Sequence, residues 1–178
     1  MASVVFLRAI NVGGANLCKP AQLAKSLSKL DIVNIGAVGT FVVRESVSDS
    51  TLRKALATQL ATDFKIKCEI MIVPGRDVLK LSENNPFARQ PSGENITRFV
   101  SVLHKRPARV PALPLDLPSD KNWLLRIVAI RDQFVLGIYR REMKAIGYLG
   151  KIEKILGEPG TVRNWNTLEK VVKILGEK

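Results

Sequence analysis

The stretch that decides the fold lies at the start of the chain, where residues 3–8 read Ser-Val-Val-Phe-Leu-Arg and residues 20–30 read Pro-Ala-Gln-Leu-Ala-Lys-Ser-Leu-Ser-Lys-Leu. The Val-Val-Phe-Leu core of the first segment predicts a β-strand. In the second segment a proline suits the first turn of a helix, and the three leucines recur at i, i+4 and i+7. The chain therefore opens with a strand followed by an amphipathic helix.

The next segments extend this order to β-α-β-β-α-β. Residues 31–37 and 40–44 are rich in β-forming side chains and flank Val38-Gly39, which predicts two antiparallel strands joined by a tight turn. A second helix follows, capped by one of the polar residues at 48–50, and residues 66–73 supply a fourth strand. This order is that of the ferredoxin-like sheet, with two helices on one face. The core side chains expected to be buried are Val5, Leu7, Leu23, Leu27, Leu52, Leu56 and Leu60.

A polar, proline-bearing connection at residues 85–95 marks the end of this part. We therefore predict a ferredoxin-like subdomain over residues 1–88 and a smaller subdomain over residues 96–178, in an α+β fold. A short helix at 76–84 is expected before the connection. After it, the second part is expected to contain a strand at 98–103, a loop with four prolines at 107–118, and a hairpin formed by 123–130 and 134–139. Two helices at 147–157 and 167–175 should end the chain, the last of them capped by Asn166.

Composition excludes several classes of protein. The apolar runs among the 178 residues are short, so no membrane span and no membrane partner are expected, and the N-terminus lacks the pattern of a signal peptide, which favours a cytoplasmic location. Cys18 and Cys68 are far apart in sequence and His104 is the only histidine, so neither a disulfide framework nor a metal site is suggested. No cofactor is expected, and the oligomeric state stays open.

The net charge of +12 and the sequence pI of about 10.1 indicate a strongly basic protein. Residues 1–97 carry a net charge of +4 and residues 98–178 a net charge of +8, so the excess lies mainly in the second half. Such a charge attracts polyanions. The possible partners are therefore nucleic acid or a phosphorylated small molecule.

The basic side chains of the second half fall into two runs. Arg98 and the run at 104–109 occur in a stretch without an acidic residue between Glu94 and Asp116, and a second run follows at 139–144. Aromatic residues are sparse there, so contacts with backbone phosphates are favoured over base reading. The alternative is a solvated loop and helix face. The candidate nucleic-acid contacts are Lys105, Arg106, Arg109, Arg140 and Arg141.

A candidate ligand loop leaves the first strand and reads Leu7-Arg8-Ala9-Ile10-Asn11-Val12-Gly13-Gly14-Ala15-Asn16. Consecutive backbone amides in such a loop can form a nest for an anion, with charge from Arg8 and amide groups from Asn11 and Asn16. The alternative is a turn in which Gly13 and Gly14 supply positive φ angles and the asparagines satisfy backbone groups. The loop carries neither a dinucleotide fingerprint nor a P-loop.

The second candidate segment is residues 161–167, Thr-Val-Arg-Asn-Trp-Asn-Thr. Arg163 can hold a carboxylate or phosphate with two hydrogen bonds, although a structural ion pair fits it equally, and Asn164 stands beside it. Trp165 is expected to be buried. Lys151, on the polar side of the preceding helix, completes the candidate ligand set. No pair of carboxylates stands at catalytic spacing, so the catalytic residues stay unknown and whether the chain is an enzyme stays open.

The two candidate segments, together with Asn85-Pro86-Phe87, resemble a bacterial family known as domain of unknown function 1697. The resemblance implies a two-subdomain α+β protein with a ferredoxin-like N-terminal part, and it implies no established activity. This chain departs from the family pattern by carrying Ala9, Val38, Thr40 and Gly150 in place of a glycine, a serine, an asparagine and a serine. If the side chains of those residues bind a ligand in relatives, these departures weaken that site here.

Three functions follow as hypotheses. The leading one is a non-enzymatic module whose basic surface binds nucleic acid or another phosphorylated anion. The alternative is a small enzyme that holds an anionic substrate in a cleft between the subdomains, using Arg8, Asn11, Lys151 and Arg163. A third is a protein-interaction role, marked by an acidic partner or a self-association surface.

Overall fold

The computed structural model of the protein describes residues 1–177. The chain divides into two compact units. Unit 1 comprises Met1–Glu83 together with the C-terminal residues from Thr167 onward, and unit 2 comprises Asn84–Asn166. The sequence placed the last helix in the second subdomain, whereas the structure groups most of it with the first unit.

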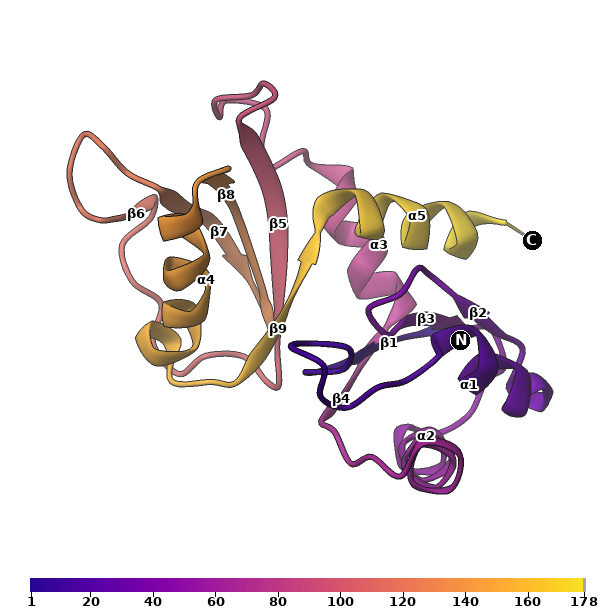
Figure 1. The fold of residues 1–178 in the computed structure, drawn as a ribbon. Coiled ribbons are helices and arrows are strands. Elements are labelled where there is room, and N and C mark those ends of the chain that lie inside the picture. The colour runs from indigo at the N-terminus through magenta and orange to yellow at the C-terminus, as the bar shows by residue number, and fades with distance from the viewer. Residues whose placement is uncertain (178) are drawn as a thin grey trace. The chain divides into compact units, whose positions relative to one another are not determined.

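Unit 1 is built on a four-stranded antiparallel sheet (Figure 1). Its elements are β1 (Ser3–Leu7), α1 (Pro20–Ser26), a short 3₁₀ turn (Ser28–Leu30), β2 (Ile32–Asn34), β3 (Thr40–Val43), α2 (Asp49–Phe64) and β4 (Ile70–Pro74). The sheet order is β2-β3-β1-β4, and all neighbouring strands are antiparallel. This is the ferredoxin-like arrangement that the order of elements predicts.

The helices α1 and α2 cover one face of this sheet. Val5 and Leu7 of β1 lie in the same buried cluster as the predicted helix leucines Leu23, Leu52, Leu56 and Leu60. Leu27 is only partly buried, because α1 ends at Ser26 and Leu27 occupies the C-cap position. The predicted core is otherwise confirmed.

The helices α3 (Gly75–Glu83) and α5 (Trp165–Gly176) lie on the opposite face of the unit 1 sheet (Figure 1). The strand residues of this face, which alternate with those of the first, are buried as well: Val4, Phe6, Val42, Met71 and Val73. The Leu175 side chain packs so closely on Gly75 that a Cβ added there would lie 2.8 Å from it. An amphipathic pattern predicts that α5 buries one face, but it carries no information about which sheet receives that face.

Unit 2 is a five-stranded antiparallel sheet of order β6-β7-β8-β5-β9. Its elements are β5 (Ile96–Leu103), β6 (Leu115–Leu117), β7 (Leu125–Arg131), β8 (Phe134–Arg140), α4 (Met143–Leu156) and β9 (Gly160–Asn164). The helix α4 covers one face, where Ile152 and Leu156 pack against Phe99, Leu103 and Leu125. The β7–β8 hairpin turns around residues 131–133, as predicted.

Two strands of unit 2 lie where the sequence analysis expected loops. The strand β6 falls inside the proline-rich stretch, between Pro114 and Pro118, and pairs with β7 at the sheet edge, where a strand flanked by prolines is tolerated. The strand β9 pairs with β5 and occupies the other edge. The helix α4 also begins four residues before the predicted start at 147.

The start of α5 differs from the predicted one. The helix begins at Trp165, and the Asn164 Oδ1 atom accepts a hydrogen bond of 2.9 Å from the backbone N–H of Asn166. Asn164, not Asn166, therefore caps the helix. The capping-box spacing of Asn166 and Glu169 misled the prediction, because the cap lies two residues earlier, at the end of β9.

Candidate anion-binding groove

The loop between β1 and α1 is a small hairpin held by its asparagines. Val12 and Ala15 form a β-bridge, and Gly13 and Gly14 have φ angles of +57° and +78°, as a type I′ turn requires. The Asn16 Nδ2 group donates to the Ala9 carbonyl at 3.1 Å. The predicted positive φ angles of the two glycines are confirmed.

Asn11 ties this hairpin to the rest of unit 1. Its Nδ2 group donates to the carbonyls of Cys18 and Ala37 at 2.8 and 3.0 Å, and its Oδ1 atom accepts from the Cys18 N–H at 2.8 Å. Arg8 lies 3.4 Å from the Glu69 carboxylate. The polar side chains of this loop are thus engaged in holding the loop, which agrees with the turn alternative of the sequence analysis.

Arg163 is an internal residue of β9, and the residue is 5% exposed. Its Nη1 group donates to Thr161 Oγ1 at 2.7 Å and to the Val162 carbonyl at 2.9 Å. Burial lowers the pKa of the Arg163 guanidinium to about 10. Lys151 lies on the exposed side of α4, with its Nζ atom 4.5 Å from the centre of the Tyr148 ring.

A polar groove lies at the end of the unit 2 sheet where β5 begins and β8 and β9 end. The groove has a volume of about 250 Å³, and its lining residues are Ser92, Gly93, Ile96, Thr97, Arg98, Arg141, Asn164 and Asn166. Two of these, Arg141 and Asn164, are among the predicted site residues. No aspartate or glutamate lines the groove, so its local charge is positive.

The two arginines of the groove, Arg98 and Arg141, contact uncharged side chains. The Arg141 Nε–H donates to Thr97 Oγ1 at 3.1 Å, which directs the two Nη groups away from that contact. The Arg98 guanidinium carbon lies 5.5 Å from the centre of the Phe87 ring. Phe87 in turn packs edge-on against Trp165, with ring centres 5.0 Å apart. Neither arginine is paired with a carboxylate within residues 1–177.

The sequence predicts Arg98 only as part of a basic run and Asn166 only as a helix cap, and it gives no sign that Ser92, Gly93 and Thr97 belong to a site. These residues come together only through strand β9, which the sequence does not predict. Once Asn164 is placed beside Phe99 by the β5–β9 register, and Arg140 beside Ile96 by the β5–β8 register, the two basic and amide-bearing segments meet at one end of β5.

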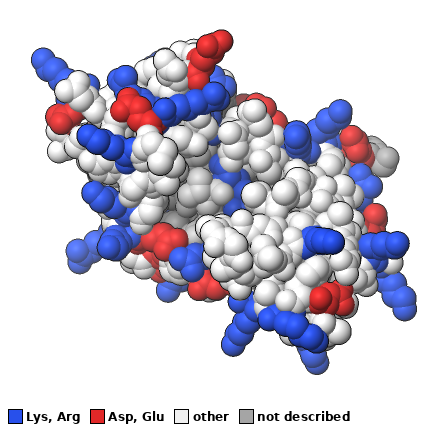
Figure 2. All heavy atoms as spheres, in the orientation of Figure 1, with Lys and Arg blue, Asp and Glu red and all other residues white. Residues whose placement is uncertain are grey.

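The five candidate nucleic-acid contacts do not form one cluster. Lys105 and Arg106 follow the last residue of β5, whereas Arg140 and Arg141 lie beside its first residue. An eight-residue strand spans roughly 26 Å, so two groups stand apart. Arg140 donates to the Trp123 carbonyl and lies over the Trp123 ring, and Lys105 lies 3.3 Å from the Glu158 carboxylate. Figure 2 likewise shows basic side chains scattered among acidic ones on the visible face.

In residues 1–177, no three histidine, cysteine, aspartate or glutamate side chains come together as a metal ion would need. None of the described helices combines the length and apolar character required to cross a membrane.

The fold and the groove define an α+β protein with a ferredoxin-like unit, a second antiparallel sheet and a basic groove at the end of that sheet. The chain belongs to the protein family of unknown function DUF1697, whose model matches residues 1–123. A solved structure of the same fold is that of the conserved bacterial protein SP0830 from Streptococcus pneumoniae, with 18% sequence identity, 98% of each chain covered and a TM-score of 0.61. A comparison with curated proteins finds no match.

Proposed function

We propose that the protein is a non-enzymatic module that binds a phosphorylated anion in the groove of unit 2. The observation that carries this proposal is the pair of guanidinium groups, Arg98 and Arg141, in a groove without a carboxylate. A guanidinium matches two phosphate oxygens at once, and two such groups favour a dianion over a single carboxylate.

The neutral groups of the groove suit the same ligand. The Ser92 hydroxyl and the side-chain amides of Asn164 and Asn166 supply donors that carry no charge of their own. Gly93 has a φ angle of +136° and no side chain, so a ligand can approach the backbone there. The lining residues include no histidine, cysteine, aspartate or glutamate, which favours binding over acid–base catalysis.

Isothermal titration calorimetry with pyrophosphate and with adenosine 5′-monophosphate tests the proposal. We expect Arg98→Gln and Arg141→Gln each to weaken binding by about tenfold or more, because each removes a charge-assisted hydrogen bond. Arg109→Gln is the matched control, since Arg109 is exposed in unit 2 and lies outside the groove. Binding that all three substitutions weaken equally, or no binding at all, would overturn the proposal.

A second arm distinguishes the source of the phosphate. A short single-stranded oligonucleotide is titrated in the same way as the two small probes. Tight binding of the small probes and weak binding of the oligonucleotide would assign the groove to a phosphorylated small molecule, and the reverse order would assign it to the phosphate backbone of nucleic acid.

A further inference from the structure

The strand β2 forms an open edge of the unit 1 sheet. Towards β3, the Ile35 N–H donates to the Thr40 carbonyl and the Asp31 carbonyl accepts from the Arg44 N–H, so Asp31, Val33 and Ile35 face β3. Because backbone groups alternate along an antiparallel strand, the N–H and C=O groups of Ile32 and Asn34 point outward. They offer a row of backbone donors and acceptors to another strand.

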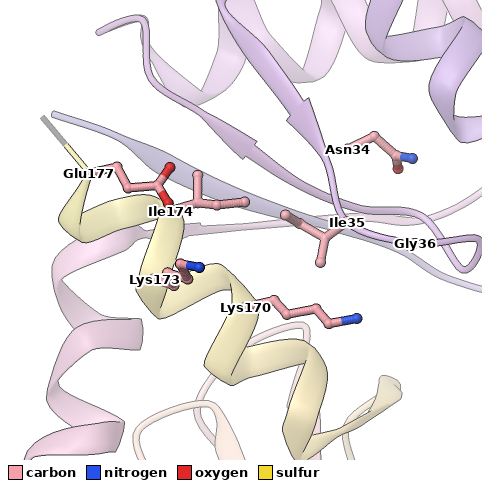
Figure 3. A pocket seen from close by; sticks show the side chains of 7 residues that line it. All are labelled: Asn34, Ile35, Gly36, Lys170, Lys173, Ile174 and Glu177. Atoms are coloured by element: carbon pink, nitrogen blue, oxygen red, sulfur yellow. The ribbon is translucent and has the colours of Figure 1, made fainter.

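A groove lies beside this edge, between β2 and α5 (Figure 3). This β2–α5 groove has a volume of about 470 Å³ and is lined by Asn34, Ile35, Gly36, Lys170, Lys173, Ile174 and Glu177. The Ile35 side chain projects toward α5, whereas the Asn34 side chain points away from it (Figure 3). Ile35 and Ile174 give the groove an apolar floor beside the outward backbone groups.

The charge of the groove is positive. Lys170 and Lys173 stand one turn apart on α5, and neither is paired with a carboxylate in the described part of the chain. The one carboxylate in the lining, Glu177, lies 3.5 Å from the Arg44 guanidinium, so its negative charge is directed to a partner outside the groove.

We propose that the β2–α5 groove binds an extended acidic segment of a partner protein, which adds to the sheet as a strand beside β2. In strand addition the backbone of the segment pairs with the edge, and alternate side chains enter the neighbouring groove. Acidic side chains on the α5 side would meet Lys170 and Lys173, and their methylene groups would cover Ile35 and Ile174. Side chains on the other side would stand beside Ile32, which packs on the α1–α2 face.

The same charges disfavour a second copy of this chain as the occupant. Pairing β2 with β2 of another copy would bring two sets of Lys170 and Lys173 to the same edge, and lysines at an open edge are a known means of preventing such association. An acidic segment turns this repulsion into attraction. The inference concerns a different unit and a different ligand from the proposed phosphate site, so each stands or fails alone.

Fluorescence anisotropy of labelled peptides on the intact protein tests the proposal. The probe is an acetylated peptide of alternating glutamate and valine, seven residues long. Two matched peptides accompany it, one with every backbone amide N-methylated and one with lysine in place of glutamate. We expect the first to bind and both others to bind at least about tenfold more weakly, because one loses strand pairing and the other the charge attraction.

Variants of the protein locate the contact. Lys170→Glu with Lys173→Glu is expected to weaken binding about tenfold, whereas Lys25→Glu with Lys54→Glu, which makes the same charge change on exposed positions of α1 and α2, is expected to leave it nearly unchanged. Asn34→Pro removes an outward N–H without breaking the β3 ladder, and Asn34→Ala keeps that N–H. The Asn34 Oδ1 atom has no hydrogen-bond partner in residues 1–177, so Asn34→Ala removes no hydrogen bond made by that atom.

Equal binding of the N-methylated peptide would overturn strand addition and leave a purely electrostatic contact. Equal loss in the two lysine double variants would overturn the location. If Asn34→Pro fails to fold in a thermal melt, the N-methylated peptide and the lysine variants still decide the question. A dimer in sedimentation analysis that the charge-neutralising Lys170→Gln, Lys173→Gln variant strengthens would assign the edge to a second copy instead.

Discussion

Gly39 shows how one residue fixes the geometry of the unit 1 sheet. Its φ angle is +74°. The N–H of Leu7, at the end of β1, donates to the Gly39 carbonyl at 2.8 Å. A Cβ atom at this position would lie 2.7 Å from Ile10 Cδ1 and 2.8 Å from Leu7 Cβ. Both the backbone conformation and the space therefore require glycine. The departure of Val38 and Thr40 from the family pattern leaves this requirement intact.

Gly36 provides a matched control in the same turn. Its φ angle is +76°, but a Cβ there would meet nothing within 4 Å. We expect Gly36→Ala to lower the free energy of unfolding by about 1 kcal/mol, which is the cost of the left-handed conformation alone. Gly39→Ala should cost about 1–3 kcal/mol more, because it also overpacks Leu7 and Ile10. Urea denaturation of both variants measures the difference, and equal losses would show that the neighbours relax without cost.

Residue types in the candidate segments could be predicted, but not what each side chain touches. The composition of the β1–α1 loop predicts positive φ angles at Gly13 and Gly14, and the structure confirms them. Whether Asn11 binds a ligand or the backbone depends on Ala37, which is 26 positions away in sequence. Similarly, the burial of the Arg163 guanidinium depends on the pairing of β9 with β5, which is about 60 positions away in sequence.

At the scale of elements, residues 161–167 are divided between β9 and the first turn of α5, and this division determines which of their side chains are buried. The sequence of residues 161–167 favours a helix entry, because Gly157 suits the end of the preceding helix, Pro159-Gly160 makes a turn, and a five-residue strand gives little periodic signal. The β-branched pair Thr161-Val162 was the available sign of a strand. Strand β9 buries Arg163 and presents Asn164 at its end, so one short segment contributes both to the core and to the groove.

Trp165 joins these two roles and should be important for stability. The residue is 7% exposed and its ring packs edge-on against Phe87, whose own ring lies against the Arg98 guanidinium of the groove. We expect Trp165→Ala to lower the free energy of unfolding by roughly 3 kcal/mol or more through cavity formation. Trp165→Phe, which keeps an aromatic ring, should cost clearly less.

Thermal and chemical denaturation of the two Trp165 variants measure these losses. A further readout follows from the stacking of Arg98 on Phe87: Trp165→Ala should also weaken pyrophosphate binding, because Phe87 loses its support. An unchanged melting temperature for Trp165→Ala would contradict the structural role and favour the indole as a ligand platform.

At the scale of the whole molecule, hydrophobic periodicity predicts most of the fold. The β-α-β-β-α-β order follows from local patterns, and it determines the sheet order of unit 1 once the ferredoxin-like topology is assumed. The grouping of α5 with unit 1 and the pairing of β9 with β5 are long-range facts, for which the pattern of a single segment holds no signal. The groove depends on both β-pairings of β5, which is why only part of it was predicted.

The net charge of +12 is also a property of the whole molecule, and its distribution leads to the last prediction. Basic side chains are divided between the two ends of β5, so nucleic acid should meet separate weak contacts instead of one continuous track. We expect micromolar or weaker affinity with slight base preference, and log K should fall steeply with log salt because each neutralised phosphate releases counterions. Charge reversal of Lys105, Arg106 and Arg109 should flatten that slope, whereas Arg163→Ala should hardly alter it, since Arg163 is buried.

Reversal of Lys25, Lys29 and Lys54 in unit 1 controls for net charge alone. Anisotropy titrations at several salt concentrations measure the slopes, and an absence of binding at about 50 mM salt would exclude nucleic acid as a partner and leave the phosphorylated small molecule.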